Sequence, residues 1–356
     1  MMENVVEFCC FVNNTGFSHA AIDYAKSMRE HGAEISIKCA HNFLMLESYE
    51  DKDKIWMQKA FDKKYNDIKH QFRHLIPPRW KNLRNAENIS ALAVFESTKP
   101  PLEWISAYKK VNNVICPSEY CADVFWSAGL NKRPIVIPHA IDIDFWDIKN
   151  RQDNEIFTIL SVGTWRQRKN WKNTIDGCII ASKNVGNIRL VIKTDRELDA
   201  SAMINSLGDL GRLQIDVVGG ELKDADMREM IRSSDCLLSA SVGEGFCISP
   251  IQAMSCGIPV VCSAVGGCLE YVTDENCIRI DARGYQNISV MDNIPQFRNQ
   301  EWAIITAEDV AEAICKLILL DKKDRADMII AARKYIEDNF AYQVVGRKMM
   351  ETIIGS

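Results

Sequence analysis

The sequence predicts an α/β protein with two parallel-sheet domains, each covered by helices on both faces. Size is the first observation: 356 residues, at roughly 150 residues per domain, make about two domains. Composition is the second, because 47% hydrophobic and 26% charged residues are typical of globular proteins and exclude a disordered or collagen-like chain. The third is that short apolar runs alternate with helical segments, as in parallel sheets covered on both faces.

The first half of the chain contains a regular series of predicted strands. An apolar run over 5–12 predicts the first strand, and an Asn-Asn-Thr-Gly turn ends it. A helix follows, because Ala21, Tyr24 and Met28 fall on one stripe. The remaining strands of this half are predicted at 34–39, 90–95, 113–116 and 134–137.

The second half repeats this alternation after a polar, irregular segment over 142–155, which we interpret as a hinge. Its strands are predicted at 157–162, 189–193, 214–218, 236–240 and 258–262. The tail over 307–354 is predicted to be wholly helical. In open α/β sheets ligands bind at the carboxyl ends of the strands, so we expect the functional residues in the loops that follow the strands.

Charge and cysteine content limit the partners and the compartment. The net charge is 43 − 48 = −5, so no overall basic field attracts nucleic acid or anionic membranes. No run approaches the roughly 18–20 apolar residues that cross a bilayer, and the N-terminus carries acids where a signal peptide carries Lys or Arg. The thirteen cysteines include no Cys-x-x-Cys pair. These features predict a reduced, cytoplasmic protein.

A basic segment over 51–84 departs from this balance, with ten Lys or Arg against four Asp. Its apolar residues recur at helical spacing and predict a helix that ends at Pro77-Pro78. The stripe consists of Met57, Phe61, Tyr65, Ile68, Phe72 and Leu75. One interpretation is a surface helix with solvated charges. The other is a helix that docks an anionic acceptor, such as a lipid-linked phosphate, an acidic glycan or a nucleic acid, with at most peripheral membrane contact.

His70 and His74 have the i, i+4 spacing of a helical metal pair. No third ligand is evident near them in the sequence, so no metal site is predicted.

The most informative stretch follows the predicted strand that ends at Ala240. An acid, Glu244, lies in the next loop, and a short helix is expected to begin at Ser249-Pro250 with Ser249 as its cap. The free N–H groups at 247–249 would then form an anion site. The pair Gly266-Gly267 after the next strand allows close approach of a backbone to a ligand. An acid beside two phosphate-sized sites suits a sugar joined to a diphosphate.

This stretch resembles the signature of family-four glycosyltransferases, which are retaining enzymes of the GT-B fold. Their pattern is Glu-Gly-Phe, five residues and a second Glu, followed downstream by Gly-Gly-x-x-Glu. Segments 113–142, 160–170 and 339–342 also resemble the family, in order and at family spacing. The resemblance implies two Rossmann-like domains facing a cleft: 1–148 on the acceptor side, 149–335 binding the donor, and 336–356 as a helix that crosses back to the first domain.

The resemblance also implies roles for individual residues. Glu244 would face the transferred sugar, and Lys169, with Arg168 or Arg166, would neutralise the diphosphate and support the leaving group. Backbone groups would contact the sugar and the diphosphate at Gly245, Phe246, Cys247 and Ile248. Gly266 and Gly267 would line the phosphate and sugar side, Gly16 in the first domain would touch the same diphosphate, and 218–221 would lie near the nucleobase.

Three positions depart from the family pattern. Gln252 replaces the second Glu, which is usually assigned to the ribose, and Gln252 also has capping-box spacing from Ser249, so both interpretations stay open. Thr164 replaces an Arg of the phosphate loop. Glu96 replaces a first-domain His, although a subset of the family has a Glu followed by Pro-Pro-x-x-Trp, as at 100–104.

The implied function is transfer of a sugar, with retained configuration, from a UDP- or GDP-sugar to an unknown acceptor hydroxyl in a glycan, a lipid-linked glycan or a protein glycan. Glu244, Glu96 and Lys169 are the predicted catalytic residues, and neither a metal nor another cofactor is expected, because cations and helix N-termini can stabilise the diphosphate. Two alternatives remain: a nucleotide-sugar-binding protein with impaired catalysis, and a phosphorylase or epimerase of the same fold.

Overall fold

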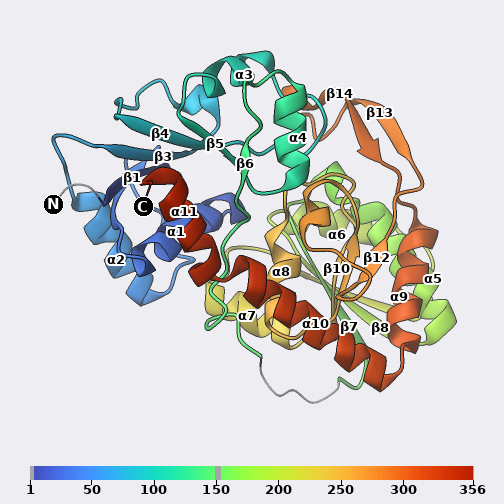
Figure 1. Ribbon diagram of the computed structural model, residues 1–356. Coiled ribbons are helices and arrows are strands. Elements are labelled where there is room, and N and C mark those ends of the chain that lie inside the picture. Colours follow the sequence, from blue (N-terminus) through green and yellow to red (C-terminus); the bar gives the residue numbers. More distant parts are fainter. Residues whose placement is uncertain (1–3, 149–153, 356) are drawn as a thin grey trace. The chain divides into compact units, whose positions relative to one another are not determined.

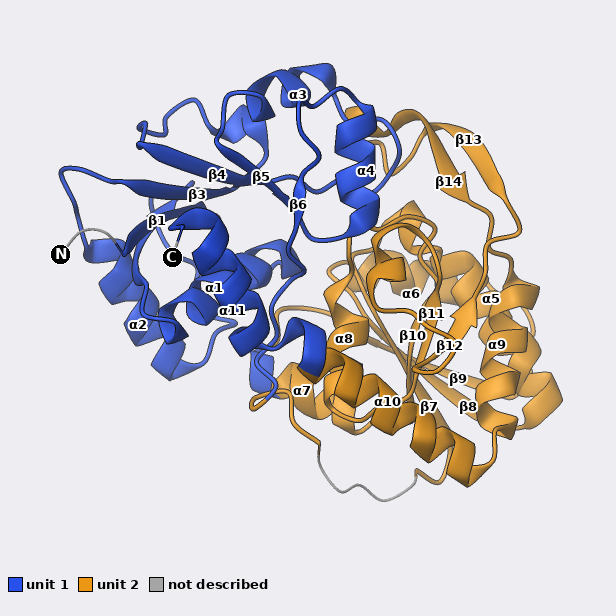
Figure 2. Cartoon of the chain, viewed as in Figure 1, with its two compact units in different colours: residues 1–143, 223–225, 338–356 blue, residues 144–222, 226–337 orange. Residues whose placement is uncertain are grey.

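The computed structural model describes residues 4–148 and 154–355, which form two compact units (Figure 1, Figure 2). The first unit comprises residues 1–143, 223–225 and 338–356, and the second comprises 144–222 and 226–337. The predicted hinge over 142–155 includes the change of unit at 143/144, and its residues 149–153 lie outside the described part of the chain. No helix among the described residues is long and apolar enough to cross a membrane.

The first unit contains a six-stranded parallel sheet in the order β2-β1-β3-β4-β5-β6. Its strands are β1 (Val5–Cys10), β2 (Glu34–Cys39), β3 (His70–His74), β4 (Asn88–Leu92), β5 (Asn113–Cys116) and β6 (Ile135–Val136). Its helices are α1 (Gly16–Glu30), α2 (Asp51–Asp62), α3 (Leu102–Tyr108), α4 (Glu119–Ser127) and α11 (Tyr342–Ile353), with a short 3-10 turn η1 (Pro77–Arg79). The strands predicted at 34–39 and 113–116 are confirmed, and the strand predicted at 90–95 lies earlier, at 88–92.

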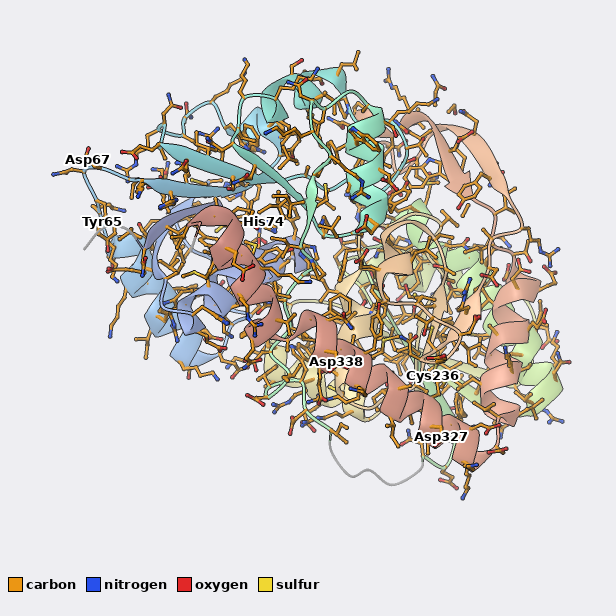
Figure 3. All side chains as sticks on the ribbon, viewed as in Figure 1. Tyr65, Asp67, His74, Cys236, Asp327 and Asp338 are labelled. Atoms are coloured by element: carbon orange, nitrogen blue, oxygen red, sulfur yellow. The ribbon has the colours of Figure 1, made fainter. Side chains whose placement is uncertain are left out.

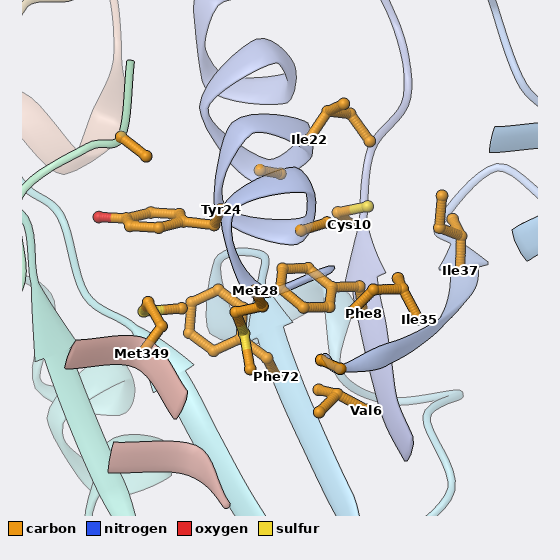
Figure 4. Close-up of a cluster of buried hydrophobic side chains, with 14 of the residues drawn as sticks. Val6, Phe8, Cys10, Ile22, Tyr24, Met28, Ile35, Ile37, Phe72 and Met349 are labelled. Carbon is orange, nitrogen blue, oxygen red and sulfur yellow. The ribbon is translucent and has the colours of Figure 1, made fainter. Parts of the chain in front are cut away.

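The C-terminal helix α11 belongs to the core of this unit, next to α1. Gly346 makes the close approach possible, because a Cβ there would lie 2.6 Å from the His31 ring and would overlap the backbone of Ser27. Met349 packs in the same cluster as Tyr24 and Phe72 (Figure 4). The predicted helical tail is therefore confirmed, and its last helix stabilises the first sheet.

The basic segment over 51–84 is not one helix. α2 ends at Asp62, Tyr65 and Asp67 lie in a loop (Figure 3), and β3 follows as a fully buried central strand. The predicted helix is therefore wrong beyond residue 62. The strand was missed because it contains polar residues, which do not form the apolar run expected of a buried strand. Gln71 donates a hydrogen bond of 2.8 Å to Glu7, and this pairing permits the burial of both side chains.

The charged residues and histidines of this segment make contacts within the first unit. Lys63 pairs with Glu34 at 2.8 Å and Arg84 pairs with Glu7 at 2.9 Å, so part of the positive charge is neutralised. His70 and His74 are buried at the two ends of the strand β3, so their i, i+4 spacing is not that of a helical pair, and burial holds the pKa of His74 well below its usual range. Docking of an anionic acceptor by α2 stays a prediction.

The second unit contains another six-stranded parallel sheet, in the order β12-β11-β10-β7-β8-β9, and an antiparallel hairpin. The strands are β7 (Phe157–Val162), β8 (Ile188–Lys193), β9 (Leu213–Val218), β10 (Cys236–Ser239), β11 (Val260–Ser263), β12 (Ile278–Ile280), and the hairpin strands β13 (Tyr285–Val290) and β14 (Arg298–Ala303). The helices are α5 (Trp171–Val185), α6 (Glu197–Asn205), α7 (Asp224–Arg232), α8 (Ile248–Ser255), α9 (Ala307–Leu319) and α10 (Lys322–Phe340), with the 3-10 turns η2 (Gln167–Lys169), η3 (Gly266–Glu270) and η4 (Pro295–Phe297).

All five strands predicted for this half are found, within two residues at each end. The hairpin β13–β14 was not predicted. Because β10 and β7 are neighbours in a parallel sheet, the loops after them leave the same edge next to each other.

Candidate active site

The predicted acid and the predicted cations meet at the carboxyl edge of the second sheet. Glu244 lies in the loop between β10 and α8, and Lys169 ends the 3-10 turn η2 between β7 and α5. Lys169 Nζ forms an ion pair with Glu244 Oε1, and Arg168 Nη1 lies 2.9 Å from Glu244 Oε2. Residues about 75 positions apart in the sequence thus form one charged cluster.

Glu244 is ionised within this cluster. Glu244 is only 4% exposed, and such burial alone would raise the pKa of a carboxyl group. The nearby charges of Arg168 and Lys169, with hydrogen bonds from Lys169 and Ser241, outweigh burial and lower the pKa of Glu244 to about 2. In turn, Glu244 raises the pKa of Lys169 although burial opposes the ammonium charge. Both groups therefore carry full charge at neutral pH.

The path of Lys169 depends on a glycine at the end of β7. A Cβ at Gly163 would lie 3.2 Å from Cδ and Cε of Lys169, so a larger residue would push against the lysine stem. The turn itself is fixed from the other side, since the Arg168 backbone N–H donates to Asp292 Oδ1 at 3.2 Å. The main chain thus directs both cations towards Glu244.

The helix after Glu244 begins two residues earlier than predicted, at Ile248. Cys247 occupies the N-cap with a φ of 70°, a left-handed conformation that is uncommon for a residue with a side chain, and no side chain caps α8. Ser249 therefore lies inside the first turn, so the predicted Ser249 cap and its capping box with Gln252 are both wrong. The first N–H groups of α8 still have no intrahelical acceptor, which leaves them suited to an anion.

Tyr271 holds the loop that leads into this helix. Its buried hydroxyl lies 3.0 Å from the carbonyl oxygens of both Phe246 and Cys247, and its ring packs edge-on against Phe246 at 5.4 Å. The sequence analysis missed Tyr271. Because a tyrosine four residues after a Gly-Gly pair carries no distinctive spacing, only the folded structure identifies its role.

The glycine pair contacts the Glu244 loop directly. The Gly267 N–H donates to the Glu244 carbonyl oxygen at 2.7 Å. A Cβ at Gly266 would lie 2.5 Å from that same oxygen, and a Cβ at Gly267 would overlap the Gly245 carbonyl group. Packing of two backbones therefore requires both glycines.

Gly267→Ala is expected to destabilise the second unit, because the new methyl group overlaps backbone atoms that no side-chain rotation can move. We expect a loss of about 2–4 kcal/mol, the upper range for steric overpacking of a tight contact, measured by urea unfolding. Gly208→Ala is the matched control, because a Cβ at Gly208 meets no atom within 4 Å. Equal stability of the two variants would contradict the packing role.

The other predicted residues are distributed over both units. Arg166 is the N-cap of η2, and Gln252 lies in the middle of α8. Gly16 and Glu96 belong to the first unit, at the start of α1 and in the loop after β4. Among residues 4–148 and 154–355, no three His, Cys, Asp or Glu side chains are arranged to hold a metal ion.

The chain is similar to known glycosyltransferases. Residues 142–287 match the family described as glycosyl transferases group 1. HepE of Anabaena, solved in complex with UDP-glucose, is 15% identical with a TM-score of 0.68, covering 98% of each chain. A glycosyltransferase from Rickettsia africae is 14% identical with a TM-score of 0.70, covering 98% of this chain and 97% of that one. Sucrose-phosphate synthase from Thermosynechococcus elongatus is 13% identical with a TM-score of 0.67, covering 98% of each chain.

No curated protein matches the chain. The structural likenesses establish the fold, which is GT-B, and the matched residues 142–287 contain Arg168, Lys169, Glu244 and the glycine pair.

Proposed function

We propose that this protein is a retaining glycosyltransferase of the family-four type, which transfers a sugar from a nucleoside diphosphate sugar to an acceptor hydroxyl. The observation that carries the proposal is the buried cluster of Glu244 with Lys169 and Arg168 beside the N-terminus of α8. The cluster lies within the segment that matches glycosyl transferases group 1. The solved complex of HepE with UDP-glucose favours a uridine diphosphate sugar as the first donor to test.

In this mechanism the protein orients the donor and stabilises the departing diphosphate. Lys169, Arg168 and the first N–H groups of α8 would bind the phosphate oxygens, on which negative charge grows as the glycosidic bond breaks. Glu244 would accept hydrogen bonds from the sugar and fix its position. The leaving diphosphate takes the acceptor proton on the same face, so retention requires no covalent nucleophile. The two cations and the helix N-terminus would stabilise the diphosphate charge in place of a metal.

The first unit would supply the acceptor side and one donor contact. A Cβ at Gly16 would meet no described atom within 4 Å, so packing within the protein does not explain this glycine. We propose that Gly16, at the first position of α1, allows the diphosphate to approach the backbone there. Glu96, which follows β4 at the same edge of the first sheet, would contact the sugar or the acceptor.

Donor binding tests the proposal. The melting temperature should rise with a UDP- or GDP-sugar and rise much less with the corresponding nucleoside. A ligand at 100 times its Kd adds about 2.7 kcal/mol of stability, which a thermal melt detects readily. Failure of uridine, guanosine and adenosine diphosphate sugars to shift the melt would contradict the proposal.

Product analysis then separates the alternatives. A transferase releases nucleoside diphosphate in proportion to the transferred sugar, whereas a binding protein with impaired catalysis raises the melting temperature without release. A phosphorylase requires inorganic phosphate, and an epimerase converts the donor with no second substrate. These outcomes are read by chromatography of the nucleotide and sugar products.

A further inference from the structure

We propose that Asp292, in the turn of the hairpin β13–β14, is a positioning residue that fixes Arg168 against Glu244. Its consequence for catalysis rests on the proposed function, whereas its effect on Arg168 does not. Asp292 lies beyond residues 142–287, the part of the chain that matches glycosyl transferases group 1.

Asp292 contacts the turn around Arg168 at three points. Its Oδ1 accepts the Arg168 backbone N–H at 3.2 Å, and its Oδ2 lies 3.5 Å from Arg168 Nε. Its own backbone N–H donates to the Gln167 side-chain oxygen at 3.2 Å. The hairpin thus holds both the backbone and the guanidinium group of the turn η2.

The arrangement of Asp292 is costly for the fold. Its side chain is 0% exposed, and Oδ2 receives no hydrogen bond among the described residues, although it faces the arginine charge. Asp292 and Asn293 both have positive φ, at 56° and 57°, inside a turn closed by a hydrogen bond from Ile294 N–H to Met291 O. Asp and Asn tolerate this conformation better than other residues with side chains, so the turn suits its sequence. A buried, incompletely satisfied carboxylate requires an explanation, and the orientation of Arg168 supplies one.

The geometry places the Arg168 guanidinium between two carboxylates. Nη1 lies 2.9 Å from Glu244 and Nε lies 3.5 Å from Asp292, so the two acids contact different nitrogens of the same planar group. Nη1 also donates to the Gly243 carbonyl oxygen at 3.4 Å, so the guanidinium is held at Nη1 by the Glu244 loop and at Nε by Asp292. Contacts at both ends fix the plane of a guanidinium, and Asp292 supplies the one at Nε.

Amide exchange tests the contact without reference to any activity. Asp292→Ala should speed exchange of the Arg168 backbone N–H by at least about tenfold, because that group loses its acceptor. The matched control is Asp281→Ala, an exposed carboxylate that pairs with Arg279 at 2.7 Å in the same unit. Unchanged exchange at Arg168 in Asp292→Ala would overturn the proposal, whether or not the protein transfers sugar.

Kinetics tests the consequence. Asp292→Asn keeps the shape and an oxygen acceptor but removes the charge, and it should lower kcat about tenfold or more with donor KM within threefold, as loss of a supporting contact does. In an Arg168→Met background the same change should have no further effect, since both variants remove one interaction. If the two substitutions lowered kcat independently, so that their effects multiplied in the double variant, the proposal would be overturned. If the wild-type protein bound no donor, the proposed function would be contradicted instead.

Discussion

Glu244→Gln is expected to lower the rate of nucleoside diphosphate release from the donor by at least about 100-fold, as loss of a transition-state contact does. Gln keeps the volume and one carbonyl oxygen but removes the charge that Lys169 and Arg168 surround. Release can be measured with water as the acceptor, so the natural acceptor need not be known. Glu275→Gln, at an exposed position of the same unit, is the control.

The melting temperature and the pH profile show whether a slower release of nucleoside diphosphate in Glu244→Gln has a catalytic cause. An unchanged melting temperature shows that the variant is folded, and turnover within a few-fold of wild type would remove Glu244 from the mechanism. Since the folded-state pKa is about 2, below the ordinary carboxyl value, the Glu244 ion pairs stabilise the fold above that ordinary value. This stabilisation is lost progressively as the pH falls from the ordinary value to about 2. Because the folded protein keeps Glu244 ionised down to about pH 2, this residue should cause no acid limb in the activity profile above about pH 3.

Lys169→Met should weaken binding of the nucleoside diphosphate by about 1.5–3 kcal/mol, the range for a hydrogen bond to a charged group, or roughly 10–150-fold in Kd. Met preserves the apolar stem that passes over Gly163 and removes only the ammonium group. Calorimetry with the nucleoside, the monophosphate and the diphosphate isolates the contribution of the phosphates.

The control for this variant is Lys172→Met, which removes an exposed lysine that pairs with Asp176 in α5. It should bind all three ligands as the wild type does. Equal weakening of all three ligands by Lys169→Met would mean that the lysine does not act on the phosphates.

The strands that could be predicted are those whose apolar runs have clear boundaries. The strands at 113–116 and 157–162 coincide with β5 and β7, because burial on both faces of a parallel sheet leaves continuous apolar runs in the sequence. β3 was missed for the opposite reason. In its sequence, His-Gln-Phe-Arg-His, the polar side chains of Gln71 and Arg73 are buried through hydrogen bonds, and Phe72 happens to continue the helical spacing of α2. Sequence patterns do not show which polar groups find partners.

The same distinction applies to the site. Glu244 and Lys169 were predicted as separate site residues, each in a loop after a strand of the second sheet, and they meet because β10 and β7 prove to be neighbours. Asp292 could not be predicted, because its hairpin has exposed strands with weak patterning and reaches η2 only in the folded chain. The residues in loops after the predicted strands were accessible to sequence reasoning, whereas the strand order that joins them and the contacts made by the added hairpin were not.

The glycine pair at 266 and 267 has a consequence for the diagnosis of activity from sequence. Since each glycine fits against the backbone of the Glu244 loop, selection for folding alone would preserve the pair in a descendant that had lost catalysis. A pseudoenzyme would therefore keep the Gly-Gly motif, so the motif by itself does not indicate activity. In this chain Glu244 retains both cationic partners. Relatives should accordingly be classified as active or inactive by whether they keep the charged residues, not by whether they keep the glycines.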